Sequence, residues 1–221
     1  MPDRQMIAII GGTGDLGSGL ALRWARAGYP VVLGSRARDK AETAAGEIAA
    51  AAPGSHVRGE DNLGAARAGD VVVIAVPFSN HDAILEEIRD AVQGKVVVDA
   101  AVPLVPPKVS VVQLPTEGSA AQIAQRILGE GVRVTSAFQN VSAKKLRDGG
   151  AVDCDVLVCG DDKAAKEATM QLADAAGTRA VDGGALANSA AAEALTSVLI
   201  GINRRYKVNG AGIRITGLPA A

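Results

Sequence analysis

The sequence predicts an α/β fold in which a doubly wound, mostly parallel sheet is followed by a small C-terminal α/β extension. Three observations support this prediction. Short β-branched runs alternate with helix-like segments along all 221 residues. A glycine-rich loop follows the first apolar run. The run at 71–76 contains no polar residue, which is typical of a parallel strand that is buried on both faces.

The glycine-rich loop contains the pattern G-x-G-x-x-G, with Gly12, Gly14 and Gly17 at its three glycine positions. In this pattern the glycines allow a tight turn, a close approach of the backbone to a pyrophosphate, and close packing of a helix on a strand. The apolar run 7–10 precedes the loop and a helical pattern follows it, which is the context that the motif requires. The loop therefore predicts a Rossmann domain that binds a dinucleotide. The alternative is a tight strand–helix turn in an α/β protein with another ligand.

The end of the second predicted strand indicates which dinucleotide is bound. An NAD site would place Asp or Glu about 20 residues after the glycine loop, to bind the ribose 2′-hydroxyl. This chain has Ser35 and Arg36 there, with Arg38 and Lys40 just beyond. A hydroxyl, a guanidinium and an ammonium group suit a 2′-phosphate, which a carboxylate would repel. The sequence thus predicts NADP rather than NAD, and the alternative is the basic start of a surface helix.

The first helix carries Leu16, Leu20 and Trp24 on one face, so Trp24 is expected in the core. A capping box formed by Ser79 and Asp82 is expected to start a helix that runs to about residue 92. The other elements expected in this part are strands at 30–36, 95–100 and 132–136, helices at 38–52, 62–68 and 119–128, and a long proline-rich loop before the last helix.

The remaining sequence predicts strands at 155–159 and 179–182 and helices at 163–176 and 190–205. We expect an NADP-binding domain over 1–137 and a smaller part over 138–221 that completes the acceptor site, with a soft boundary that also allows one domain. The last helix is apolar, and with Ile213 and Ile215 it is expected to pack between two subunits of a homodimer. The alternative is packing on its own sheet.

Composition excludes several classes of function. A net charge of −1 and 2% aromatic residues argue against a nucleic-acid partner. No apolar run is long enough to span a membrane and no secretory pattern begins the chain, so we expect a cytoplasmic protein. Cys154 and Cys159 lie on opposite faces of a predicted strand, which argues against a disulfide. No cluster has metal-ligand spacing, so no metal is expected.

Acid–base groups are scarce, and no catalytic side chain is predicted. His56 lies in a turn and is expected to be exposed. His81 follows the fourth strand, where it is either a polar residue of a helix's first turn or a substrate-binding residue. Tyr206 and Lys207 are adjacent, so they do not form a Tyr-x-x-x-Lys pair. Because reduction of a ketone needs a nearby proton donor, hydride transfer to another redox cofactor fits this chain better.

With these motifs the chain resembles the NADPH-dependent reductases of coenzyme F420, a deazaflavin. The resemblance covers nearly the whole chain and is carried by residues 11–17, by Gly34-Ser35-Arg36 with Lys40, and by residues 119–121, 158–162, 186–189 and 193–196. It implies direct hydride exchange between NADPH and F420. The alternatives are an NADPH oxidoreductase with another acceptor, such as a flavin, quinone or imine, and a non-catalytic NADPH-binding sensor.

The resemblance also implies site residues. The resemblance would place the pyrophosphate at Thr13, Gly14, Asp15 and Leu16, the 2′-phosphate at Ser35, Arg36 and Lys40, and the nicotinamide beside Val76, Pro77 and the segment around Ala101. The motif glycines Gly12 and Gly17 and the nearby Arg38 are further candidates for binding the nucleotide, as is Ala137. The acceptor would lie near Ala137, Phe138, Gln139, Asn140 and the C-terminal segment; His81 is a separate candidate, suggested by its place after the fourth strand. Family members often carry a histidine at the position of Phe138 and a proline at the position of Ser197, so this chain departs from the family in the expected acceptor pocket.

Overall fold

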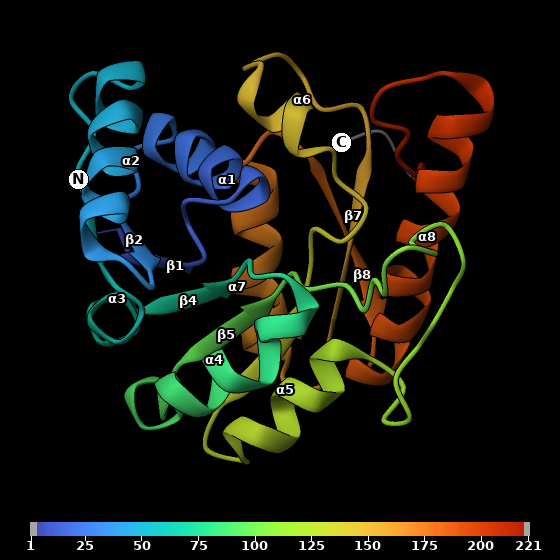
Figure 1. Cartoon of the computed structure of the whole chain (residues 1–221), viewed down its shortest axis with the longest axis horizontal. Coiled ribbons are helices and arrows are strands. Elements are labelled where there is room, and N and C mark those ends of the chain that lie inside the picture. The colour runs from blue at the N-terminus through green and yellow to red at the C-terminus, as the bar shows by residue number, and fades with distance from the viewer. Residues whose placement is uncertain (1–3, 219–221) are drawn as a thin grey trace.

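A single eight-stranded sheet with helices on both faces forms the computed structural model, which describes residues 4–218 (Figure 1). The strand order is β3-β2-β1-β4-β5-β6-β7-β8, and neighbouring strands are parallel except β6 and β7. The first six strands have the order of a Rossmann fold. The predicted fold class is therefore confirmed.

The strands are β1 (Ile7–Ile10), β2 (Val31–Ser35), β3 (Val57–Asp61), β4 (Val71–Ile74), β5 (Val96–Asp99), β6 (Arg133–Ser136), β7 (Asp155–Gly160) and β8 (Arg179–Gly184). The α-helices are α1 (Asp15–Arg26), α2 (Arg38–Ala51), α3 (Asn62–Ala68), α4 (His81–Ile88), α5 (Ala120–Leu128), α6 (Ala143–Arg147), α7 (Lys163–Ala175) and α8 (Ser189–Tyr206). Short 3₁₀ turns are η1 (Phe78–Asn80), η2 (Arg89–Val92) and η3 (Leu186–Asn188).

Alternation along the strands divides the core into two layers. Ile7 and Ile9 of β1 belong to a layer formed with α1, α2 and α7. Ala8 and Ile10 of the same strand belong to the other layer, formed with α3, α4 and α5. Successive strand residues point to opposite faces, so a strand covered on both sides must be apolar throughout. This requirement explains the uninterrupted apolar runs in β1 and β4.

Trp24 on α1 lies in the core, as predicted. Its indole Nε1 donates a hydrogen bond to the carbonyl of Leu172 on α7, at 2.8 Å. Its ring meets Phe138 edge to face, with 5.8 Å between the ring centroids. One helix next to the glycine loop is thus packed against the C-terminal part of the chain.

The proposed boundary at 137/138 follows β6 directly, where the sheet changes from parallel to antiparallel. The sheet continues across this point without a linker. Arg23 on α1 reinforces the junction, because its guanidinium donates to the carbonyls of Lys145, Leu146 and Gly150 at 2.6 to 2.8 Å.

Several local predictions differ from the structure. The edge strand β3 and the short helix α6 were not predicted. The strand predicted at 71–76 ends at Ile74. The predicted capping box is wrong: Ser79 lies inside the 3₁₀ turn η1, and α4 begins at His81 without a side-chain cap.

The predictions for His56 and for the two cysteines are confirmed. His56 is exposed. Cys154 and Cys159 are buried free thiols. Between residues 4 and 218, no helix combines the length and the apolar character needed to cross a membrane.

Gly59 on β3 is expected to be essential for stability, because a Cβ atom there would collide with the backbone of α2 at Ala41 and Glu42. Gly59→Ala should lower the free energy of unfolding by about 3 kcal/mol or more. Gly46→Ala is a matched control, since Gly46 lies within α2 and a Cβ there meets nothing within 4 Å. This change should raise stability by ~0.5–1 kcal/mol. Urea unfolding of both variants measures the difference, and equal effects would contradict the proposed packing.

Candidate functional site: a nucleotide crevice and an adjoining pocket

The glycine loop joins β1 to α1 at the carboxyl edge of the parallel strands. The backbone N–H groups of Gly11 and Gly12 both donate to the carbonyl of Gly34 on β2, at 3.1 and 3.0 Å. Gly11 has a φ of +79°, a left-handed conformation that glycine adopts without strain. The loop is therefore fixed to the second strand, the strand that ends in Ser35.

The three glycines of the motif are needed for different reasons. A Cβ atom on Gly12 would lie 2.8 Å from the Leu33 side chain, and one on Gly17 would lie 2.7 Å from the Gly11 carbonyl oxygen. Packing within the chain thus explains these two glycines. A Cβ atom on Gly14 would meet only the Gly11 carbonyl oxygen closely, at 3.3 Å. Gly14 is exposed, so the space in front of it is free for a ligand that approaches the backbone.

Helix α1 begins directly after the glycine loop, so its first N–H groups have no partner within the helix. Gly14 is the N-cap residue, and no side chain caps the helix. Such uncapped N–H groups and the helix dipole favour an anion. Asp15 in the first turn would oppose an anion, but Arg147 of α6 pairs with its carboxylate. The ion pair reduces the negative charge beside the presumed phosphate position.

The cations beyond β2 are not equivalent. Arg36 and Lys40 are exposed, and neither takes part in an ion pair within the described residues. Arg38 instead pairs with Glu42 at 2.8 Å and with Glu60 at 3.2 Å. We therefore leave Arg38 out of the proposed phosphate contacts. By neutralising Glu60, it keeps the surroundings of Ser35 and Arg36 favourable for an anion.

A pocket of about 180 Å³ lies between the glycine loop, the end of β2 and the end of β4. It is lined by Gly11, Thr13, Gly14, Ser35, Arg36, Asn62, Ala75, Val76, Pro77, Asn80 and Ile84. Val76 and Pro77, which the resemblance placed beside a nicotinamide, thus share a pocket with the proposed 2′-phosphate residues. Asn62 was not predicted; it is 3% exposed, and its Oδ1 atom has no hydrogen-bond partner among the described residues.

The ends of β5 and β6 form the other half of the crevice. Ala101 and Ala137, the residues proposed for this half, are almost completely buried. The backbone N–H of Ala101 donates to Asp99 Oδ1 at 2.8 Å, and that of Ala137 donates to the Asp99 carbonyl at 3.1 Å. Asp99 was missed in the sequence, although a polar residue ending an all-valine strand was an available signal.

A second pocket of about 170 Å³ adjoins this half, between the segment after β6, helix α8 and the C-terminal segment. Gln139 and Asn140 line it, as do Thr196, Asn203 and Ala211. The Asn140 side chain donates to the Ala192 carbonyl at 2.8 Å and so fixes α8 to the sheet. Two of the predicted acceptor residues, which are neighbours in sequence, thus line this pocket, where each is 6% exposed.

Phe138 does not join them. It has a φ of +74°, which turns its side chain into the core, where it is 2% exposed and packs against Trp24. The aromatic ring therefore contributes to stability and offers no surface to an acceptor.

His81 is also inaccessible, with 0% of its surface exposed. Its Nε2 lies 2.7 Å from Asp99 Oδ2, and its Nδ1 lies 3.2 Å from Asp82 Oδ1. Burial opposes the charged imidazole, but the charge and hydrogen bond of Asp99, together with Asp82, outweigh it and raise the pKa of His81. The histidine is thus held by a buried carboxyl group, and the imidazole cannot touch a substrate in this conformation.

Glu193 on α8 is a second buried carboxyl group, and the sequence alone indicated no role for it. It is 1% exposed and accepts hydrogen bonds from the backbone N–H groups of Ala120 and Ala121, at 2.7 and 3.2 Å. Burial, reinforced by the charge of Asp99, raises the pKa of Glu193 to about 8, although the two N–H donors and His81 favour the carboxylate. Glu193 thereby joins α8 to the first turn of α5.

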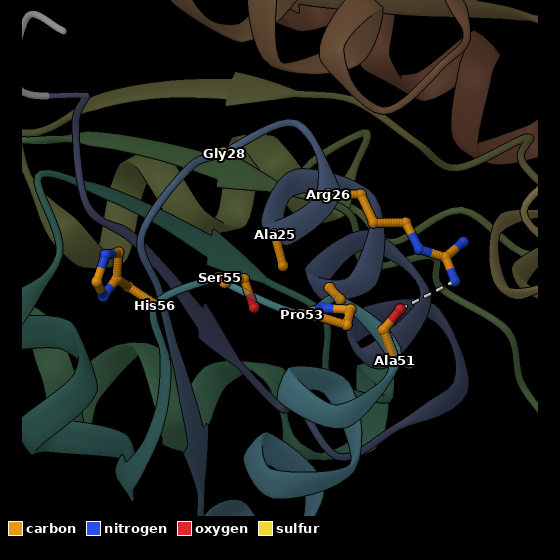
Figure 2. Close-up of a pocket in the computed structure, with 9 residues that line it drawn as sticks. Ala25, Arg26, Gly28, Ala51, Pro53, Ser55 and His56 are labelled. Atoms are coloured by element: carbon orange, nitrogen blue, oxygen red, sulfur yellow. Dashed lines mark hydrogen bonds between the residues drawn. The ribbon is translucent and has the colours of Figure 1, made fainter.

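Another pocket, of about 380 Å³, lies at the ends of α1 and α2, away from the glycine loop. Figure 2 shows its lining residues, including Pro53, Ser55 and His56, and the hydrogen bond from Arg26 to the Ala51 carbonyl. Its lining is mostly small residues. No group of three or more His, Cys, Asp or Glu side chains suited to a metal occurs between residues 4 and 218.

The strand order, the glycine loop and the adjoining cations define a Rossmann-type protein of the NADP-binding class. Residues 6–103 match the family model described as NADP oxidoreductase, coenzyme F420-dependent. The F420-dependent NADP reductases of Methanocaldococcus jannaschii and Methanothermobacter thermautotrophicus are 42% and 45% identical to this chain. Each alignment covers 96% of this chain and, respectively, 98% and 95% of the relative. The chain belongs to the F420-dependent NADP reductase family.

A solved structure agrees with this assignment. The putative F420-dependent NADP reductase of Arthrobacter sp. FB24 superimposes with a TM-score of 0.79 at 26% identity. The match covers 96% of this chain and 99% of the Arthrobacter chain. The similarity therefore includes the C-terminal part as well as the glycine-loop half.

Gly14 and Gly17 should separate ligand binding from folding. In Gly14→Ala the Gly11 carbonyl must shift by only a few tenths of an ångström, so the free energy of unfolding should change by less than about 1 kcal/mol. The affinity for NADPH should nevertheless fall about tenfold or more, because the new Cβ blocks the approach of the phosphates. Gly17→Ala should lower stability by about 2 kcal/mol, because its Cβ meets backbone atoms. Thermal unfolding and calorimetric titration measure both quantities. Unchanged NADPH affinity in Gly14→Ala would refute the proposed approach of the phosphates.

Glu193 predicts how stability depends on pH. Its pKa is about 8 in the folded chain against an ordinary 4.5, so the folded state retains a proton that the unfolded chain releases. The contribution of Glu193 to stability should therefore be complete below pH 4.5 and decline by ~1.4 kcal/mol per unit as the pH rises towards 8. His81, whose pKa is raised from 6.5, adds a decline of the same sign above pH 6.5.

Glu193→Gln should abolish the decline between pH 4.5 and 6.5 and leave the contribution of His81 above pH 6.5. Asp155 and Asp182, whose pKa values are lowered from 3.8, lose their contributions at lower pH, outside this window. Urea unfolding across this pH range measures the slope. An identical slope in the wild type and the variant would show that Glu193 is not the group responsible.

Proposed function

We propose that this protein transfers a hydride between NADP(H) and the deazaflavin coenzyme F420. The proposal is supported above all by the exposed cations Arg36 and Lys40, which follow β2, the strand to which the glycine loop is hydrogen-bonded. The chain is also similar to F420-dependent NADP reductases over nearly its full length. The proposal is also supported by two pockets, one between the glycine loop and the ends of β2 and β4, and one beside the segment that follows β6.

In this proposal, NADP lies along the carboxyl edge of the strands. The glycine loop and the N-terminus of α1 bind the pyrophosphate, and Ser35, Arg36 and Lys40 bind the 2′-phosphate. The small pocket with Val76, Pro77 and Asn62 also contains the 2′-phosphate residues, so we assign it to the adenosine, and Val76 and Pro77 move from the nicotinamide position expected from the resemblance. The nicotinamide then extends to the ends of β5 and β6, beside Ala101 and Ala137.

The acceptor is proposed to lie over the nicotinamide, next to Gln139 and Asn140 and the pocket under α8. When bound, the two cofactors supply the hydride donor and the hydride acceptor. The protein holds the two rings face to face, a contribution of proximity and orientation. Reduced F420 gains one proton besides the hydride, and solvent can supply it, so this role needs no side chain that donates or removes a proton.

A spectroscopic assay tests this function directly. Mixing the protein with NADPH and oxidised F420 should bleach the visible absorption of the deazaflavin, and NADP with reduced F420 should restore it. Reduction of a flavin, a quinone or an imine without exchange with F420 would instead assign another acceptor. Binding of NADPH without reduction of any acceptor would indicate a non-catalytic NADPH-binding sensor.

We further propose a cytoplasmic homodimer. The exposed apolar side chains Val111, Val112 and Leu114 belong to the loop after β5, and Val198 lies on α8. Figure 1 shows this loop beside α8, and Ser110 reaches the helix at Gly201. An apolar surface of this kind favours contact with another subunit, and two free thiols suit a reducing compartment. A sedimentation coefficient of a monomer at micromolar concentration would refute the dimer.

Arg36→Ala tests the choice of nucleotide. Loss of charged hydrogen bonds to a 2′-phosphate should weaken NADPH by about 1.5–3 kcal/mol and leave the affinity for NADH nearly unchanged. Arg38→Ala serves for comparison and should weaken NADPH less, because Arg38 is engaged by Glu42 and Glu60. Calorimetric titration of both nucleotides measures the difference. Equal loss of NADPH and NADH in Arg36→Ala would refute the phosphate contact.

A further inference from the structure

The buried ion pair of His81 and Asp99 lies at the carboxyl edge of the sheet, where α4 begins and β5 ends. Both side chains have no exposed surface, and 2.7 Å separates His81 Nε2 from Asp99 Oδ2. Two buried charges lose their hydration, and a buried ion pair often stabilises a protein less than an apolar pair of the same volume would. Stability alone therefore gives a weak reason for a charged pair at this position.

Asp99 connects three segments at once. Its Oδ2 atom contacts His81, and its Oδ1 atom accepts a hydrogen bond from the backbone N–H of Ala101 at 2.8 Å. Its carbonyl accepts from the Gln139 side chain at 2.9 Å and from the backbone of Ala137 at 3.1 Å. These are the segments proposed above for the nicotinamide and for the acceptor. One aspartate thus sets the shape of the edge on which both rings would lie.

We propose that His81 and Asp99 are positioning residues for hydride transfer, in which the imidazole holds the aspartate so that its other oxygen fixes the Ala101 peptide beneath the nicotinamide. The inference rests on the proposed function. Neither residue touches a reacting atom, and both act through the backbone of Ala101 and the side chain of Gln139.

The position of the pair predicts an effect on rate rather than on binding. The proposed anchors of NADP are the glycine loop, Ser35 and Arg36, which belong to β1 and β2, whereas the pair belongs to β5 and α4. A variant that relaxes the Ala101 peptide should still bind the nucleotide through these anchors. A displacement of about 1 Å at the reacting atoms can reduce a rate about a hundredfold.

Asp99→Asn is the sharpest variant, because an amide has one acceptor oxygen where the carboxylate has two, so the side chain cannot hold the imidazole and accept from the Ala101 N–H at once. We expect its hydride-transfer rate to fall at least about tenfold, with the dissociation constants of NADPH and F420 within about threefold of wild type. Stopped-flow absorbance in a single turnover measures the rate, and calorimetry measures the affinities. Asp70→Asn is the control, since Asp70 accepts from the Met6 backbone N–H at the opposite edge of the sheet.

Variants of His81 provide an independent measurement if Asp99→Asn does not fold. His81→Gln retains a donor for Asp99, so it should keep more of the hydride-transfer rate than His81→Ala at similar NADPH affinity. Where Asp99→Asn folds, the double variant His81→Gln/Asp99→Asn should lose little more than Asp99→Asn alone, because the two residues act as one unit.

Two results would overturn the proposal. In the first, folded Asp99→Asn or His81→Ala transfers hydride within twofold of wild type. In the second, rate and NADPH affinity fall in parallel, which indicates a purely structural pair. Failure of the proposed function is distinguishable, because then the wild-type protein itself would not exchange hydride between NADPH and F420.

Discussion

Close contact between the glycine loop and the start of α1 is the constraint on which the rest of the structure depends. The helix can sit this close to β1 because Gly17 has no Cβ to meet the Gly11 carbonyl. This contact sets the direction of α1, which places its uncapped N–H groups at the crevice and Trp24 in the core. Through Arg23 and Trp24 the same helix also binds the segment 145–150 and α7. The proposed phosphate-binding end and the proposed acceptor half are therefore held together by one element.

The sequence predicts those parts of the candidate site that depend on local rules. A glycine spacing, a strand ending in Ser35 and Arg36, and the helical repeat that buries Trp24 all act within a few residues, so a single sequence displays them. Strand β3 was not predicted, because it is an edge strand that pairs with one neighbour only and carries the charged residues Arg58, Glu60 and Asp61. Helix α6 has five residues, too few for a periodic pattern.

The parts of the site that escaped prediction depend on contacts between distant residues. Phe138 follows a strand end, a usual position for a ligand contact, but a positive φ turns it towards Trp24. His81 lies near the crevice in sequence, yet Asp99 engages its imidazole inside the protein. The partners of Glu193 lie about 70 residues away on α5. No local pattern contains these pairings, since they arise when the sheet brings separate strand ends to one edge.

The only tryptophan of the chain gives the protein an internal optical reporter. Its indole is shielded from water between Phe138 and the Leu172 carbonyl, on the helix whose first turn faces the nucleotide crevice. Emission from this single fluorophore is free of background from other indoles and shifts to longer wavelength when water reaches the core. Reduced nicotinamide absorbs in the range where indole emits, so quenching by energy transfer reports nucleotide occupancy, while the red shift reports loss of the core.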